Sequence, residues 1–403
     1  MAHFRRIEVP PSREAPRPAG FALWQLGFRP FYLLASVFAA LSIGLWALQF
    51  AGWLGRPYLA GPLWHAHEML FGFTLAVIVG FLLTAGRNWS NRPTLSGAPL
   101  AALAALWLAG RILVLTPWGW AAAFANAAFP LAAAVALAIP FVAARTRRND
   151  FFVGLLVLLS AAVAGVHLAQ LGAIDLPGWA GIHVALDVVL FVMAVMGGRV
   201  IPMFTNNGVP GAGAERRAAV ERVALGSVLA LLAADLVAPF AGLPGAPLAA
   251  LCAVAAAAHG LRWALWRPWR TLARPLVWVL HAAYAWIPLH LALRAGAELG
   301  LLAPTLATHA LTVGAIGGLV IGMMTRTARG HTARHLQADR FDVACYALVL
   351  GAAVVRVALP LALPAWSLGA IVTSAALWSA GFALYALRYG PQLCRPRLDG
   401  KPG

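Results

Sequence analysis

Apolar runs of about twenty residues recur along the whole chain, and they constrain its fold more than any other feature of the sequence. An α-helix rises about 1.5 Å per residue, so a run of that length crosses the roughly 30 Å hydrocarbon core of a bilayer. We therefore predict an all-α membrane protein with about 12 transmembrane helices. The expected spans are residues 30–51, 63–86, 97–116, 121–144, 151–172, 182–204, 221–240, 247–266, 275–294, 304–326, 341–361 and 365–388.

The composition excludes a water-soluble fold. Of 403 residues, 62% are hydrophobic and 11% are charged, whereas a soluble domain carries roughly 25% charged residues. The first twenty residues are polar and contain no apolar stretch of the kind found in a cleavable signal peptide. We expect a cytoplasmic N-terminal tail over residues 1–26, one polytopic transmembrane domain over 27–388 and a cytoplasmic C-terminal tail over 389–403.

The net charge of +17 indicates orientation in a membrane rather than nucleic-acid binding. Most of the arginines lie in loops that fall on one side of the membrane if the N-terminus is inside the cell. This asymmetry follows the positive-inside rule and predicts that both termini are cytoplasmic. The outer loops and outer helix ends then hold only Arg56, Arg111, Arg294 and Arg356.

With this orientation, the scarce ionisable side chains gather in the outer half of the membrane. Ionisable groups at membrane depth are costly and usually mark function. The acids in question are Glu68, Asp187 and Asp235. Six of the eleven histidines lie there, namely His65, His67, His167, His183, His290 and His309.

A weak internal repeat relates the second, sixth and tenth spans. The pattern GG-x-VI-x-M-x-T occurs at residues 197–205 and again at 317–325. His67 precedes Gly72 by the same spacing with which His309 precedes Gly314. The pattern predicts three four-helix units, although small residues also recur wherever membrane helices pack closely.

Imidazoles from several helices that begin at the outer face could surround a haem iron, copper or zinc. His65 and His67 lie about 200° apart on a helix, so we assign them to different centres, with Glu68 behind His67. His183 and Asp187 are four residues apart, the spacing at which a carboxylate can hold an imidazole that binds a metal. The alternative for any single histidine at a helix end is an interfacial residue without a ligand.

Longer motifs then identify a resemblance. Trp64-His65-Ala66-His67-Glu68-Met69-Leu70-Phe71-Gly72 and the block from His309-Ala310-Leu311-Thr312-Val313-Gly314-Ala315 to Gly330-His331-Thr332 resemble the NnrS family, and the likeness covers nearly the whole chain. The resemblance implies a haem- and copper-containing protein of the bacterial inner membrane that is associated with denitrification and with resistance to nitric oxide and nitrosative stress. The positions that carry over are His65, His67, Glu68, His281, His309 and His331.

The repeat is also similar to the catalytic subunit of haem–copper oxidases, whose three arcs of four helices carry metal ligands on helices 2, 6, 7 and 10. Helix 7 here, residues 221–240, contains no histidine, which argues against a binuclear centre of the oxidase kind.

Our leading hypothesis is a haem b protein that binds or turns over nitric oxide, or another small gas, in the outer leaflet. His67 and His309 are the candidate axial ligands, and His281 is a further cofactor candidate. Copper is expected near His65 with His183 as a candidate ligand; the electron donor is unknown. The alternative is a transporter of a metal or small molecule that uses the same histidines and acids as its path.

Overall fold

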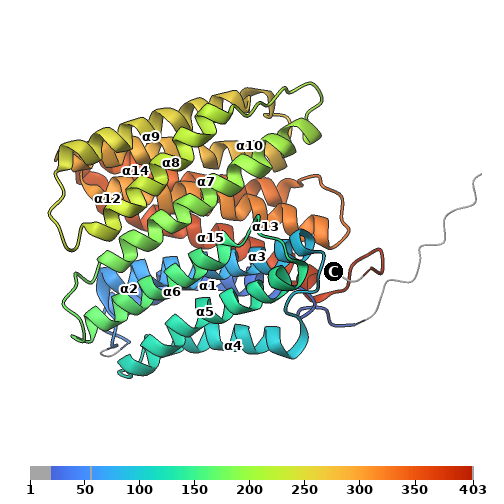
Figure 1. The fold of residues 1–403 in the computed structure, drawn as a ribbon, viewed down its shortest axis with the longest axis horizontal. Coiled ribbons are helices and arrows are strands. Elements are labelled where there is room, and N and C mark those ends of the chain that lie inside the picture. The colour runs from blue at the N-terminus through green and yellow to red at the C-terminus, as the bar shows by residue number, and fades with distance from the viewer. Residues whose placement is uncertain (1–19, 55–56, 402–403) are drawn as a thin grey trace, which may run out of the picture.

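The computed structural model describes residues 20–54 and 57–401, and every regular element in these ranges is helical (Figure 1). The predicted all-α fold is therefore confirmed for the described residues. Arg56 and residues 1–19 of the expected N-terminal tail lie outside them. The elements are α1 (Phe28–Phe50), α2 (Gly61–His67), η1 (Glu68–Thr74), α3 (Leu75–Ser90), α4 (Gly97–Leu113), α5 (Gly119–Ala144), α6 (Phe151–Gln170), α7 (Ala180–Gly208), α8 (Ala218–Val237), α9 (Gly245–Leu265), η2 (Pro268–Arg270), α10 (Pro275–Tyr284), α11 (Trp286–Glu298), α12 (Pro304–His309), η3 (Ala310–Gly317), α13 (Gly318–His331), α14 (Arg340–Ala362), η4 (Pro364–Trp366) and α15 (Ser367–Cys394).

Ten helical segments of the described chain are long and apolar enough to cross a membrane, so the protein is built as a multi-pass membrane protein. Each of the twelve expected spans coincides with a helix, but two of these helices do not qualify as spans by length and composition. Helix α4 has only 17 residues, which reach about 26 Å. Helix α8 carries Glu221, Arg222 and Asp235 within its 20 residues.

The helices run side by side in one bundle, and their connecting loops lie at its two ends (Figure 1). Helix α1 packs against both α3 and α15, so the first and last helices of the chain are neighbours. Helices α2 and α12 lie toward the same end of the bundle, and the C-terminus lies at the opposite end (Figure 1). We call the end with the C-terminus the Arg-rich end, because it also carries most of the arginine-bearing loops.

Two of the spans change their helical winding along their length. Each begins as a short α-helix, passes through a π-helix of seven or eight residues, and continues as an α-helix. The π-helix η1 begins directly after His67, and the π-helix η3 begins directly after His309. π-Helical turns are rare and often occur at functional sites, so the two backbone irregularities mark the regions next to these histidines.

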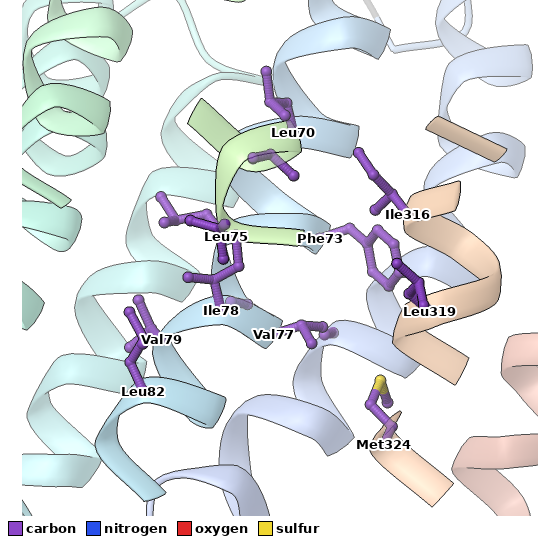
Figure 2. Packing of buried hydrophobic residues seen from close by; sticks show 14 of the residues in the cluster. Leu70, Phe73, Leu75, Val77, Ile78, Val79, Leu82, Ile316, Leu319 and Met324 are labelled. Atoms are coloured by element: carbon purple, nitrogen blue, oxygen red, sulfur yellow. The ribbon is translucent and has the colours of Figure 1, made fainter. Parts of the chain in front are cut away.

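The interior between the two irregular spans is apolar. Figure 2 shows Phe73 of η1 beside Ile316 of η3 and Leu319 of α13. All three belong to one large cluster of buried hydrophobic residues. A cavity of about 100 Å³ lined mainly by apolar side chains lies among α3, α7 and α13, next to this cluster. No histidine lines this cavity.

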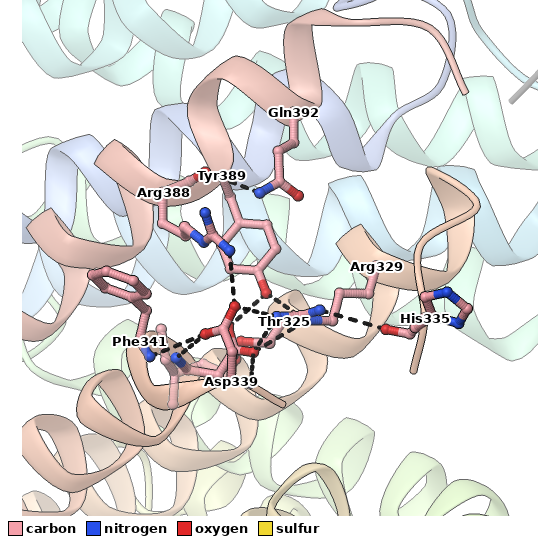
Figure 3. Close-up of polar contacts among 10 residues, drawn as sticks. Thr325, Arg329, His335, Asp339, Phe341, Arg388, Tyr389 and Gln392 are labelled. Atoms are coloured by element: carbon pink, nitrogen blue, oxygen red, sulfur yellow. Dashed lines mark hydrogen bonds and ion pairs between the residues drawn. The ribbon is translucent and has the colours of Figure 1, made fainter. Parts of the chain in front are cut away.

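An ionic cluster ties α13, α14 and α15 together at the Arg-rich end (Figure 3). Asp339 caps α14, and its Oδ2 atom lies 2.9 Å from Arg329 and 2.8 Å from Arg388. Arg329 also contacts the buried Asp342 at 2.6 Å, and Tyr389 donates a hydrogen bond to the same carboxylate. These bonds hold the last three long helices in register.

Candidate metal centre

Two fully buried histidines face each other near the end of the bundle opposite the Arg-rich end. His67 is the last residue of α2, and His167 lies in the last turn of α6. Their Nε2 atoms are 3.1 Å apart, and their rings are nearly perpendicular, with an interplanar angle of 81°. Two nitrogens that each lie about 2.0 Å from one ion cannot be more than about 4 Å apart, so this separation lets both imidazoles reach a single metal ion.

A carboxylate contacts the other ring nitrogen of His67. Oε1 of Glu68 lies 2.7 Å from Nδ1 of His67, and Oε2 lies 3.3 Å from Nε of Arg111. Arg111 donates a further hydrogen bond to Asn126 of α5, and its guanidinium lies over Gly72, where a side chain would collide with it. The buried negative and positive charges therefore balance each other, which a low-dielectric interior requires.

A tyrosine contacts the other ring nitrogen of His167. The hydroxyl of Tyr58 lies 3.3 Å from Nδ1 of His167 and 3.1 Å from the carbonyl oxygen of the same residue. Burial raises the pKa of Tyr58 to about 12, so the hydroxyl keeps its proton at neutral pH. The ring nitrogen of a metal-binding histidine that does not bind the metal usually has such a partner.

With Glu68 ionised, the network has two self-consistent arrangements of protons. Because the Glu68 carboxylate accepts the proton of Nδ1, the Nε2 atom of His67 carries a lone pair. If Tyr58 donates to Nδ1 of His167, the two imidazoles share an ordinary hydrogen bond. If Tyr58 instead donates to the carbonyl oxygen, both Nε2 atoms carry lone pairs, and only a cation between them relieves their repulsion.

His65 and His309 belong to a different neighbourhood. The ring of His65 stacks on Trp46, with centroids 4.6 Å apart. Nδ1 of His309 donates to the carbonyl oxygen of Thr305 at 2.7 Å, which leaves the lone pair of Nε2 available. Arg356 lies within electrostatic reach of both imidazoles. The predicted separation of His65 from His67 agrees with this arrangement, since the two side chains have different partners.

The ring nitrogens of His67 have partners within the protein, in Glu68 and His167. The pair of His67 and His309 as axial ligands of a haem stays a prediction.

The expected pair of His183 and Asp187 is replaced by a different one. Asp187 lies 3.1 Å from Arg294 of α11, and the same guanidinium contacts Asp235 at 2.7 Å and Glu298 at 3.5 Å. His183 is exposed. Spacing along α7 places the two side chains on one face, but a guanidinium from a third helix neutralises the buried carboxylate more completely than a neutral imidazole can.

The histidines predicted at the Arg-rich side have separate surroundings. Nε2 of His281 lies 2.8 Å from Oγ1 of Thr205, and its Nδ1 atom is buried without a hydrogen-bond partner among the described residues. The ring of His331 lies against Phe28, with centroids 5.4 Å apart. Within residues 20–54 and 57–401, no group of three or more His, Cys, Asp or Glu side chains could hold a metal ion.

Sequence reasoning did not identify the partners that complete the His67 network. Arg111, Asn126 and Tyr58 were not candidates, and His167 was only one of several outer histidines. Two of the four outer arginines were the available signal. Arg111 pairs with Glu68, and Arg294 pairs with Asp187 and Asp235, so these two arginines mark buried acids.

Comparison with known proteins assigns the family. No curated protein matches the chain significantly. The sequence model described as the NnrS protein matches residues 22–397, nearly the full length. The predicted resemblance is thereby confirmed, and the chain belongs to the NnrS family.

Proposed function

We propose that this protein is a copper-binding membrane protein of the nitric oxide response, with His67 and His167 holding the ion. The observation that carries the proposal is the 3.1 Å separation of two buried Nε2 atoms whose Nδ1 atoms both face a polar partner. Imidazole suits copper among the divalent metals. A bound copper ion would offer a coordination position to a small diatomic ligand.

The protein's own side chains set the conditions at this position. Glu68 contacts Nδ1 of His67, and Arg111 lies beside that carboxylate, so that a negative charge on Glu68 would be balanced within the membrane. His67 and His167 are both fully buried, so water is excluded from the pair. Nitric oxide is small and apolar and needs no polar path to reach such a site through lipid.

A haem b remains a prediction that rests on the resemblance. The better supported candidate for its axial ligand is His309, since Thr305 orients its ring and leaves Nε2 free. The π-helices that follow His67 and His309 support the proposed equivalence of the second and tenth spans. We place the Arg-rich end and both termini in the cytoplasm and the protein in the bacterial inner membrane, as the charge asymmetry predicts.

Metal analysis of the purified full-length protein tests the copper proposal. After reconstitution with copper, the wild-type protein should retain about one ion per chain, with nitrogen hyperfine structure in the electron paramagnetic resonance spectrum of Cu(II). His167→Ala should lose this ion. His290→Ala is the matched control, because His290 is also buried but donates to the Ala307 carbonyl, and it should retain copper.

Addition of nitric oxide should change the spectrum of the copper-loaded wild-type protein. Equal copper content and unchanged hyperfine structure in wild type and His167→Ala would refute the site. A colourless, copper-free protein that transports a metal ion in vesicles would favour the transporter alternative.

A further inference from the structure

A hollow of about 500 Å³ opens at the Arg-rich end, far along α3 from the histidine pair. It lies between the segment that precedes α1, the end of α3 and the start of α4. Its polar lining residues are Gln25, Arg87, Thr94 and Ser96, with Trp24 beside them. Among residues 20–54 and 57–401, no acidic residue lines the hollow.

Arg87 is half-buried in the last turn of α3 and lines the hollow. Its guanidinium makes no hydrogen bond or ion pair with any of the residues that the structure describes. By contrast, the buried or half-buried arginines Arg111, Arg262 and Arg329 each pair with a carboxylate, whereas Arg199 bonds to the side-chain amide of Asn149 and Arg326 lies over the ring of Phe204. A guanidinium held in a pocket without an acid is a ready partner for an anion.

A second polar group in the hollow also has no partner. Oγ1 of Thr94 is buried and makes no hydrogen bond with the described residues. A buried hydroxyl without a partner is costly, so its presence in the lining points to a ligand that supplies an acceptor.

The walls of the hollow are fixed by backbone hydrogen bonds between distant parts of the chain. The amide of Gly97 donates to the carbonyl oxygen of Trp24 at 2.7 Å, and the amide of Ala22 donates to that of Cys394 at 2.8 Å. The segment that precedes α1 is therefore held against both α4 and the end of α15. Because these walls are already ordered, a ligand that binds there loses little free energy to the ordering of the protein.

We propose that this hollow binds a phosphate group through Arg87 and Thr94, either that of an anionic phospholipid or that of a soluble phosphate compound. Its place at the ends of membrane-crossing helices, with the exposed ring of Phe21 and the indole of Trp24 in its lining, favours the phospholipid. The proposal does not depend on a metal at His67 and His167.

The test uses the full-length protein in nanodiscs of phosphatidylcholine, with or without phosphatidylglycerol. Native mass spectrometry should show phosphatidylglycerol retained on the wild type, and Arg87→Gln should retain about fivefold less. Thr94→Val should show a smaller loss. Arg92→Gln is the matched control, because Arg92 is an exposed arginine five residues along that does not line the hollow, and it should match the wild type.

A second arm adds inorganic phosphate to the protein in phosphatidylcholine discs. If phosphate raises the thermal unfolding midpoint of the wild type but not of Arg87→Gln, and phosphatidylglycerol is not retained, the ligand is a soluble phosphate compound. Binding in neither arm would overturn the proposal. An equal loss of phosphatidylglycerol in Arg87→Gln and Arg92→Gln would also overturn the proposal. Such a result would mean that the lipid responds only to the total positive charge of the Arg-rich end.

Discussion

The guanidinium of Arg262 occupies the space that a β-carbon on Gly198 would need. From this position Arg262 donates to both oxygens of Glu221, at 2.8 and 2.6 Å, and to the carbonyl oxygen of Ala194 at 2.8 Å. Tyr284 accepts another of its hydrogen bonds. The ion pair that joins α7, α8 and α9 inside the membrane therefore depends on a glycine, which gives a physical reason for the second glycine of the GG motif.

The substitution Gly198→Ala should destabilise the protein. The added methyl group would displace Arg262 from a buried, hydrogen-bonded position, and overpacking of this kind costs about 1–3 kcal/mol. We expect a lower midpoint of thermal unfolding in detergent, followed by fluorescence and size-exclusion chromatography. Gly165→Ala in α6 is the control, because a β-carbon there meets no atom within 4 Å, and it should leave the midpoint unchanged or raise it. Equal midpoints for the two variants would contradict the proposed role of Gly198.

The fold was largely predictable because apolar length alone identifies a membrane helix. Its internal breaks were not predictable. The π-helices after His67 and His309, and the interruption at Ala285 between α10 and α11, occur within continuous apolar runs. In a membrane the hydrophobic pattern carries little periodicity, so the sequence gives no signal of a change in helical winding.

The candidate site was predictable only in part. Depth in the membrane indicated the outer histidines and Glu68, since charge and polarity are scarce there. The pairing of His67 with His167 depends instead on which helices become neighbours, and these two residues are 100 positions apart. The pairing of Asp187 with Arg294 also depends on which helices become neighbours. Arg294 is 107 positions away from Asp187 along the chain, yet it contacts Asp187 in place of His183, which lies one helical turn away.

The carboxylate of Glu68 should tune metal binding without being a ligand itself. In Glu68→Gln the amide can still accept from Nδ1 of His67, but the negative charge that strengthens this bond is lost. Loss of such an outer partner typically lowers metal affinity by about 10–100-fold. Competition with a chromogenic copper chelator measures the change. Glu215→Gln, at an exposed acid in the loop before α8, should leave the affinity unchanged, and a wild-type affinity in Glu68→Gln would exclude the proposed role.

The cap of α14 should make stability depend on pH. Partial burial tends to raise the pKa of Asp339, but hydrogen bonds from Arg388 and the charge of Arg329 outweigh it and hold the pKa below its usual value. A carboxyl group with a lowered folded-state pKa stabilises the fold above its unfolded pKa, and this contribution disappears as the pH falls through the folded-state pKa.

Asp339→Asn should therefore unfold at a lower temperature than the wild type near pH 7, by an amount that corresponds to about 1 kcal/mol or less. Asparagine still caps a helix well, so the substitution removes mainly the charge. The gap between the two proteins should narrow in acid, below about pH 4, where the wild-type carboxyl group becomes neutral too. Asp175→Asn, at an exposed loop position, should show no such gap. A gap that is constant with pH would refute the electrostatic explanation.

Arg294 should be indispensable because it neutralises more than one acid. It bridges Asp187 of α7 and Asp235 of α8, and Asp187 is fully buried. Removal of one partner of a buried ion pair costs about 3–5 kcal/mol, because the remaining charge is left uncompensated. We expect Arg294→Ala to unfold at a much lower temperature than the wild type, whereas Arg222→Ala, at an exposed arginine of α8, should change little.

A second substitution distinguishes lost charge balance from lost packing around Arg294. In Arg294→Ala with Asp187→Asn, the amide replaces the buried charge that the single variant leaves unpaired. Part of the stability should return, so that the double variant is more stable than Arg294→Ala alone. If the losses of stability from the two substitutions simply add, the guanidinium of Arg294 acts through packing and not by balancing the charge of Asp187.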